Sequence, residues 1–162
     1  MIKTFNLKNL KTLLISLAVT LIPAGLSALI TMDSMGRYNE LTKPFFAPPS
    51  NVFGIVWAIL YPLIGIGLFL ILKDGLDMPG VKDAVKKYLY LIALLFIWPI
   101  LYFNFELDLI SLIVIITSFI LSVYVGKAFF EQNRIAGIIL WILSAWLGFA
   151  TLLSSSIYIL NV

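Results

Sequence analysis

Five long runs without a charged side chain dominate this sequence and limit what it can fold into. The runs cover Leu13–Thr31, Val52–Leu72, Tyr88–Phe105, Leu109–Gly126 and Ile135–Val162. About 18 helical residues cross a hydrocarbon core about 30 Å thick, because an α-helix rises 1.5 Å per residue. The chain is also 62% hydrophobic, where roughly half is usual for a soluble domain. The sequence therefore predicts an all-α membrane protein with five transmembrane helices.

We expect a single domain over residues 1–162, because five helices with short joints cannot form separate cores. The predicted spans are 13–31, 52–72, 88–105, 109–126 and 135–159. The joint between the third and fourth spans is only a few residues long, so those two helices should be antiparallel neighbours. The segment Met32–Asn51 is long and compositionally distinctive, and we expect it to form a structured extracellular loop.

The basic residues predict which way the helices run through the membrane. With a cytoplasmic N-terminus, the outside segments hold only Arg37 and Lys43. The inside segments then hold Lys3, Lys8, Lys11, Lys73, Lys82, Lys86, Lys87, Lys127 and Arg134. Cytoplasmic segments carry an excess of Lys and Arg, so the pattern predicts N-terminus in and C-terminus out. A cleaved signal peptide is the rival interpretation of the first run, but that run exceeds an h-region and no A-x-A site follows.

The residue types that are missing exclude several kinds of chemistry. The chain has no Cys and no His, which removes disulfides, zinc sites, thiol nucleophiles and the commonest haem ligands. None of the uncharged runs can supply a membrane-embedded carboxylate for proton relay or ion coordination. The basic residues border helices rather than form a stripe, which argues against nucleic-acid binding. A metal site, an ion-coupled pump and conventional acid–base catalysis are all disfavoured.

Tryptophans inside three of the runs suggest a binding pocket. Trp57, Trp98 and Trp146 lie too deep to belong to the interfacial aromatic belt. A buried indole N–H needs an acceptor, which inside a bilayer must be protein, trapped water or ligand. Core packing is the alternative for each one alone, but three on three helices favour a pocket for a flat apolar ligand. Trp141 is rotated about 140° from Trp146, and we expect it to face lipid or a partner.

Two further patterns within the runs have alternative interpretations. Pro23, Pro62 and Pro99 each remove a backbone donor, and are either tolerated kinks or a means of opening a cavity. Small residues recur four positions apart, which lets helix backbones approach closely. These rows either pack within the chain or form a dimer face. They are Ser118, Ser122 and Gly126, then Ser144 and Gly148, then Ala150 and Ser154.

Motifs along the whole chain resemble those of the TspO/MBR family, also called translocator proteins, tryptophan-rich sensory proteins or peripheral benzodiazepine receptors. In and after the first loop the matching residues are Tyr38, Leu41, Lys43-Pro44, Pro48-Pro49, Val52-Phe53-Gly54, Trp57 and Leu60-Tyr61. The third run supplies Trp98-Pro99 and Tyr102-Phe103, and the fifth supplies Trp146, Phe149-Ala150 and Leu153.

The resemblance implies a five-helix bundle, commonly a homodimer, with a pocket capped by the first loop. It implies a receptor or sensor in a bacterial plasma membrane that binds tetrapyrroles, such as protoporphyrin IX or haem, or benzodiazepine-type molecules, with no required cofactor. A transporter of such compounds is the alternative. The expected ligand-binding residues are Lys43, Pro44, Phe46, Pro48, Pro49, Trp57, Tyr61, Trp98, Tyr102, Trp146, Phe149 and Ser154. Some members promote photo-oxidative breakdown of protoporphyrin, which by this resemblance would use Trp57 and Trp146.

The chain departs from the family pattern at several positions that bear on the ligand. Phe46 and Arg37 stand where the family has Trp, and Leu95 and Ser154 stand where it has Asn. Ile142-Leu143 replaces the usual Pro-Tyr, and no Lys or Arg follows Tyr158 to complete the proposed cholesterol motif.

The composition of the first loop suits a lid over such a pocket. Its prolines, Pro44, Pro48 and Pro49, stiffen it at low entropic cost. We expect Phe45 and Phe46 to give it an apolar underside. Lys43 would place a cation at the mouth of the pocket, suited to a ligand carboxylate such as a porphyrin propionate; the alternative is a solvated loop charge.

Overall fold

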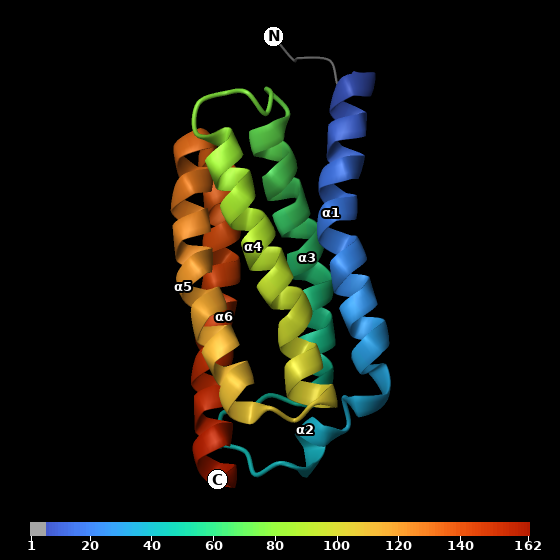
Figure 1. Ribbon diagram of the computed structural model, residues 1–162, viewed down its shortest axis with the longest axis vertical. Helices are drawn as coiled ribbons and strands as arrows, with labels where there is room; N and C mark the ends of the chain where they lie inside the picture. The colour runs from blue at the N-terminus through green and yellow to red at the C-terminus, as the bar shows by residue number, and fades with distance from the viewer. Residues whose placement is uncertain (1–5) are drawn as a thin grey trace.

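The computed structural model describes residues 6–162, which form an elongated bundle of five long helices (Figure 1). The long helices are α1 (Leu7–Thr31), α3 (Ser50–Leu72), α4 (Val81–Pro99), α5 (Asp108–Gln132) and α6 (Arg134–Asn161). Three short helical segments join them: the 3₁₀ turn η1 (Met32–Ser34), α2 (Arg37–Glu40) and the π-helix η2 (Ile100–Asn104). No strand occurs in this part of the chain. The predicted all-α fold is confirmed.

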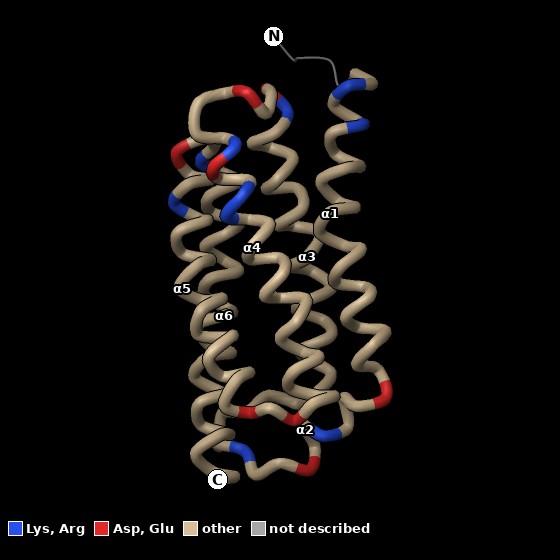
Figure 2. Tube along the Cα trace, viewed as in Figure 1, with Lys and Arg blue, Asp and Glu red and all other residues tan. Residues whose placement is uncertain are grey.

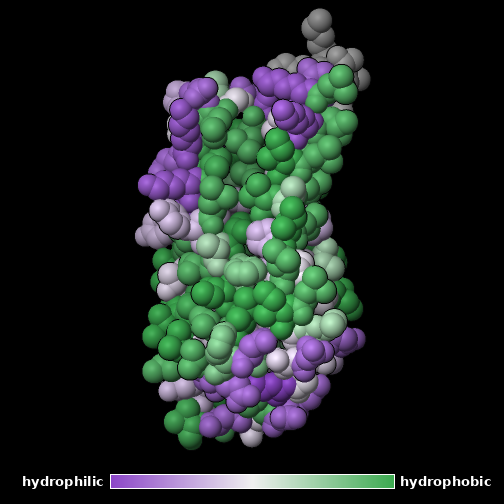
Figure 3. Space-filling view, turned by 45° about the vertical axis from the view of Figure 1, so that its right-hand side comes forward, coloured by the Kyte–Doolittle hydropathy of each residue, from purple (hydrophilic) through white to green (hydrophobic). Residues whose placement is uncertain are grey.

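Five helical segments are long and apolar enough to cross a membrane. They are Leu7–Ser34, Ser50–Leu72, Val81–Asn104, Asp108–Gln132 and Arg134–Asn161. Charged residues gather at the two ends of the bundle (Figure 2). A mostly apolar band lies between two hydrophilic ends on the face shown in Figure 3. Apolar side chains such as Leu14, Ile113 and Leu152 are exposed, as expected for a protein surface that meets lipid. The chain is an integral membrane protein.

The helices extend past the predicted spans because charged residues continue them beyond the apolar core. α1 starts at Leu7 rather than at residue 13, and α4 starts at Val81 rather than at residue 88. Asn6 caps α1 by accepting a hydrogen bond from the Asn9 N–H at 2.9 Å. Lys3, part of the basic count that predicts orientation, lies outside the described residues.

The five long helices form a ring around a shared core. α1 packs against α3 and α4, α3 against α6, α6 against α5, and α5 against α4. The expectation that the third and fourth spans are neighbours is therefore confirmed. Fully buried apolar side chains such as Ile64, Leu91, Leu140 and Leu147 fill the centre. We call the end that carries α2 and the C-terminus the loop end; the N-terminal end is opposite (Figure 1).

Pro99 changes the helix type where it interrupts α4. The Ile100 N–H donates to the Ile97 carbonyl, and the chain then continues as the π-helix η2. The carbonyl of Phe96 accepts a hydrogen bond from the Ser27 hydroxyl of α1 at 2.9 Å. A neighbouring helix thus supplies the donor that α4 lacks, as membrane helices with proline require.

The small-residue rows of α5 and α6 pack against each other within the chain. The Ser122 hydroxyl donates to the Ser144 hydroxyl oxygen at 2.8 Å, and both residues are buried. Gly148 faces the ring of Phe119, and Gly126 faces the indole of Trp141. Ser122 and Gly126 of α5, and Ser144 and Gly148 of α6, therefore serve close α5–α6 packing within the chain.

Candidate functional site

Aromatic side chains of α3 and α6 meet inside the bundle. The rings of Trp57 and Tyr61 stack with centroids 5.0 Å apart. Trp57 meets Trp146 of α6 edge to face at 6.5 Å, and Trp146 also contacts Phe149 at 5.4 Å and Phe53 at 6.0 Å. These are the spacings of favourable aromatic pairs. Two of the three deep tryptophans predicted from the sequence to line one pocket are thus in direct contact.

The third deep tryptophan belongs to a second aromatic group on α4 and η2. Trp98 stacks on Tyr102 at 5.3 Å with an interplanar angle of 10°, and Tyr102 meets Phe103 at 4.9 Å. Phe103 and Phe149 both pack against a small buried cluster that contains Leu153. The two aromatic groups therefore adjoin the same cluster near the loop end. We call them together the aromatic site.

Two indole N–H groups in the aromatic site have no hydrogen-bond partner. Among residues 6–162, Trp98 Nε1 and Trp146 Nε1 are the only buried side-chain nitrogen or oxygen atoms without one. An unsatisfied buried donor costs about 1–3 kcal/mol, and lipid offers no replacement acceptor. Both donors belong to tryptophans that the sequence predicts to line a pocket. An acceptor on a bound molecule would satisfy them.

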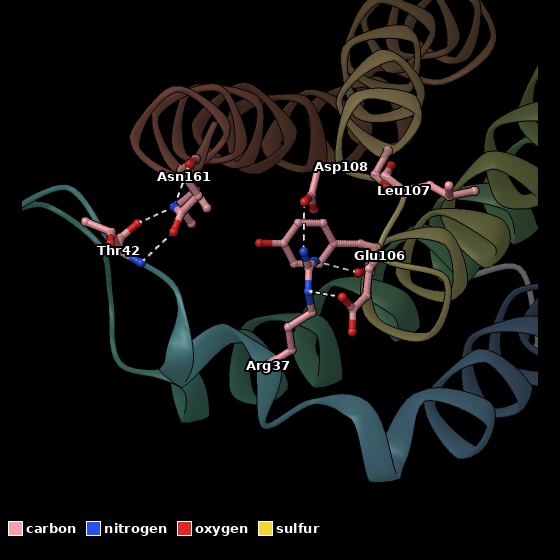
Figure 4. A network of polar contacts seen from close by, with 9 residues as sticks. Arg37, Thr42, Glu106, Leu107, Asp108 and Asn161 are labelled. Atoms are coloured by element: carbon pink, nitrogen blue, oxygen red, sulfur yellow. Dashed lines mark hydrogen bonds and ion pairs between the residues drawn. The ribbon is translucent and has the colours of Figure 1, made fainter.

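The first loop, residues 32–49, lies across the loop end and is fastened at several points (Figure 1). Tyr38 is buried, its hydroxyl donates to the Pro48 carbonyl at 2.8 Å, and its ring meets Phe53 edge to face. Thr42 and Asn161 exchange two hydrogen bonds at 3.0 and 2.9 Å, which tie the loop to the end of α6 (Figure 4). The loop is an ordered cover rather than a loose tether.

The prolines of the loop shape its two turns. The Ala47 N–H donates to the Pro44 carbonyl, and the Val52 N–H donates to the Pro49 carbonyl, each at 3.0 Å. Pro44 and Pro48 are partly buried, whereas Pro49 is exposed and immediately precedes α3. The three prolines thus set the path of the loop.

The two phenylalanines of the loop meet edge to face, with ring centres 5.5 Å apart, but they differ in exposure. Phe46 lies 6.4 Å from Phe149, ring centre to ring centre, and so forms part of the apolar underside. Phe45 is fully exposed, with a relative accessibility of 102%. The expectation that both rings form the apolar underside is wrong for Phe45. It lies in the turn closed by the Ala47 N–H and the Pro44 carbonyl, and its ring extends outward from that of Phe46.

Lys43 is held by the loop itself. Its ammonium donates to the carbonyls of Tyr38, Asn39 and Leu41 at 2.9, 3.2 and 2.9 Å, and it lies 5.1 Å from the Tyr38 ring centre. A lysine has three N–H donors, so all are occupied. Lys43 stabilises the carbonyl end of α2, where a cation is favoured. A ligand carboxylate could reach it only if one of these bonds broke.

Arg37 was not among the site residues expected from the sequence, where it served only in the orientation count and as a departure from the family pattern. Its guanidinium donates to the Tyr102 carbonyl and to Asp108 Oδ2, each at 2.8 Å, and lies 3.9 Å from Glu106 Oε2 (Figure 4). It also lies 5.0 Å from the Tyr102 ring centre. The bond to Asp108 raises the pKa of Arg37 above its ordinary value. The arginine therefore stays charged and joins the loop to η2 and α5.

A small cavity, lined by both apolar and polar side chains, lies beside the aromatic site at the loop end. Its volume is about 20 Å³, enough for roughly one water-sized group and far too small for a tetrapyrrole. Tyr102 and Ser154, both predicted ligand-binding residues, line it. Trp57 and Trp146 also pack too closely for a flat ring to lie between them. Ligand binding therefore requires the loop or the rings to move.

The fold and the aromatic site define a class: a five-helix membrane protein whose tryptophan-rich interior is closed by a fastened loop. A model of the TspO/MBR family matches residues 12–160. The chain belongs to the TspO/MBR family, as its motifs suggested.

Relatives of the chain come from archaea, bacteria and animals. It is 33% identical over 126 residues to the tryptophan-rich protein TspO of Archaeoglobus fulgidus, covering 76% of this chain and 79% of the relative. It is 29% identical over 128 residues to the human translocator protein, covering 78% and 75%. The tryptophan-rich sensory protein of Cereibacter sphaeroides is 26% identical over 117 residues, covering 72% and 70%.

Proposed function

We propose that this chain is a membrane receptor or sensor that binds a flat, mostly apolar molecule of the tetrapyrrole class in the aromatic site. The observation that carries the proposal is the pair of partnerless indole donors, Trp98 Nε1 and Trp146 Nε1. Membership of the TspO/MBR family supports the ligand class. Benzodiazepine-type molecules, which also carry aromatic rings, would compete for the same site.

The residues of the site would make two kinds of contact with the ligand, stacking and hydrogen bonding. Trp57, Tyr61 and Phe149 offer ring faces and edges for stacking. The indoles of Trp98 and Trp146 offer hydrogen bonds to acceptors on the ligand. The first loop would open to admit the ligand and then cover it, because its fastenings to α5 and α6 are individual polar contacts that can break.

We further propose that Trp57 and Trp146 take part in light- and oxygen-dependent breakdown of a bound porphyrin. Their rings are in contact and lie at the centre of the aromatic site. Illumination of the protein with protoporphyrin IX in air, followed by product analysis, tests this step. The same sample without oxygen is the control.

Protoporphyrin IX should quench the tryptophan fluorescence of the protein saturably, because the indoles lie where the ring would bind. The titration is done in nanodiscs of zwitterionic lipid, with empty nanodiscs as the blank. A linear, non-saturating response equal to the blank would refute the receptor proposal. Accumulation of the porphyrin inside sealed vesicles that contain the protein would instead indicate a transporter.

We propose that the loop end faces outward and the N-terminal end faces the cytoplasm, in a bacterial plasma membrane. A cysteine at Ser50, which is exposed, should react with a membrane-impermeant maleimide in intact cells. A cysteine at Met78, 51% exposed at the opposite end, should react only after lysis. The native chain contains no cysteine, so the background is clean. The reverse labelling pattern would overturn this orientation.

A homodimer is proposed from the family resemblance. The small residues of α5 and α6 already pack within the chain, so a dimer would use other lipid-facing surfaces. Crosslinking in native membranes tests for it.

A further inference from the structure

The small cavity at the loop end adjoins the aromatic site through residues that belong to both. Tyr102, which lines the cavity, stacks on Trp98. Leu41 and Ile157 also line it, and both belong to the apolar cluster under the loop that includes Phe46 and Phe149. A substituent on a molecule bound at the aromatic rings could therefore reach the cavity.

The groups that line the cavity include one carboxylate, and some of the donors among them are already used. The Ser111 hydroxyl already donates to the Leu107 carbonyl at 2.8 Å. The side-chain amide of Asn161 donates to the carbonyls of Thr42 and Ile157. Asp108 carries a carboxylate, and only one of its oxygens bonds to Arg37 at 2.8 Å. The hydroxyls of Tyr102, Ser154 and Tyr158, which also line the cavity, can act either way.

The charges around the cavity also favour a ligand group that donates hydrogen bonds over a carboxylate. Among residues 6–162, Asp108 is the one charged residue that lines it. The two cations at this end are engaged, Arg37 by Asp108 and the Tyr102 carbonyl, and Lys43 by three loop carbonyls. Glu106 is a further carboxylate beside Arg37. A ligand carboxylate would meet like charge here and find no free cation.

We propose that this cavity is a subsite for a small hydrogen-bond-donating substituent, with a cationic amine preferred, on the flat ligand of the aromatic site. The inference rests on the proposed function and adds a specificity to it. The cavity holds one water-sized group, which fits an ammonium or hydroxyl group better than a carboxylate with its three heavy atoms. The chain should therefore prefer flat ligands that have lost or masked their acidic side arms.

The test compares three ligands that share one ring. They are protoporphyrin IX, its dimethyl ester and its bis(2-aminoethyl) amide, which carry negative, neutral and positive arms. Binding to the full chain in zwitterionic nanodiscs is followed by the porphyrin absorbance band, with empty nanodiscs as the blank. We expect the amide to bind about tenfold more tightly than the diacid, since a hydrogen bond to a charged group contributes at least that factor. The ester should fall between them.

Two variants connect the preference to the cavity. Asp108→Asn should remove the preference for the amide, because it removes the carboxylate and releases Arg37. Ser154→Val keeps the charges but fills the cavity, and should weaken the amide while leaving the ester unchanged. Glu40→Gln, which neutralises an exposed carboxylate at the same end, is the control and should change nothing. Each variant is judged by the ratio of its affinities for the different ligands, because this ratio does not depend on the folded fraction of the variant.

The outcomes separate the two proposals. Two results would overturn the subsite and leave the receptor proposal standing. One is saturable binding of all three ligands with the diacid tightest. The other is an amide preference that survives both Asp108→Asn and Ser154→Val. Absence of saturable binding by any of the three would overturn both.

Discussion

Replacing both Trp57 and Trp146 with phenylalanine should remove most of the protoporphyrin-dependent fluorescence quenching and all light-dependent breakdown of the porphyrin. The ring centres of Trp57 and Trp146 are 6.5 Å apart, edge to face. Trp146 carries one of the two buried indole N–H groups that have no hydrogen-bond partner. Phenylalanine keeps an apolar ring but loses the N–H and part of the stacking area. We expect the affinity for protoporphyrin IX to fall at least tenfold, about 1.4 kcal/mol. The porphyrin absorbance band measures this fall independently of tryptophan fluorescence.

Trp141→Phe is the matched control for that experiment. Trp141 is 40% exposed and stacks on Phe130 at 5.0 Å, away from the other three tryptophans, as its rotation along α6 predicts. Its replacement should leave porphyrin affinity and breakdown unchanged. A double variant that binds and degrades protoporphyrin like the native protein would show that the ligand lies elsewhere. Breakdown that persists with normal affinity would show that these indoles do not take part in the photochemistry.

The sequence predicted the membrane fold and the centre of the aromatic site because both depend on local information. Each span is a run of apolar residues long enough to cross a bilayer, which needs no knowledge of its neighbours. The depth of Trp57, Trp98 and Trp146 along their helices follows from the rise per residue. The indoles of Trp98 and Trp146 are buried, and neither has a hydrogen-bond partner within the chain.

The loop was harder to predict because its contacts join residues that lie far apart in the sequence. Arg37 pairs with Asp108, and Thr42 pairs with Asn161. Nothing in the local sequence distinguishes such a pair from two solvated polar side chains. The ammonium of Lys43 was expected at the pocket mouth or in solvent, but it binds carbonyls of its own loop. One signal was available: Glu106 and Asp108 flank the short joint at the same end as Arg37.

Gly137 is a second feature that only the packed structure reveals. A Cβ added there would lie 2.5 Å from the Cα and 2.7 Å from the N of Phe130, and closer still to its Cβ. These are atoms of α5 that cannot rotate away. The joint between α5 and α6 is short, and the Gly137 N–H donates to the Asn133 carbonyl at 3.0 Å. A methyl group at this position must push the two helices apart.

Gly137→Ala should therefore lower the free energy of unfolding by about 3 kcal/mol, the upper range for overpacking a core. Gly126→Ala should cost less, about 1 kcal/mol. A Cβ there meets only the indole of Trp141, which is partly exposed and can swing outward. Gly25→Ala, with nothing within 4 Å of the added carbon, is the control and should stabilise α1 by up to about 1 kcal/mol, because alanine favours helix. Denaturation by SDS in mixed micelles measures all three.

If Gly137→Ala proved as stable as Gly25→Ala, α5 and α6 could not approach each other this closely. The α5–α6 contact that buries Ser122 and Ser144 would then have to be looser as well.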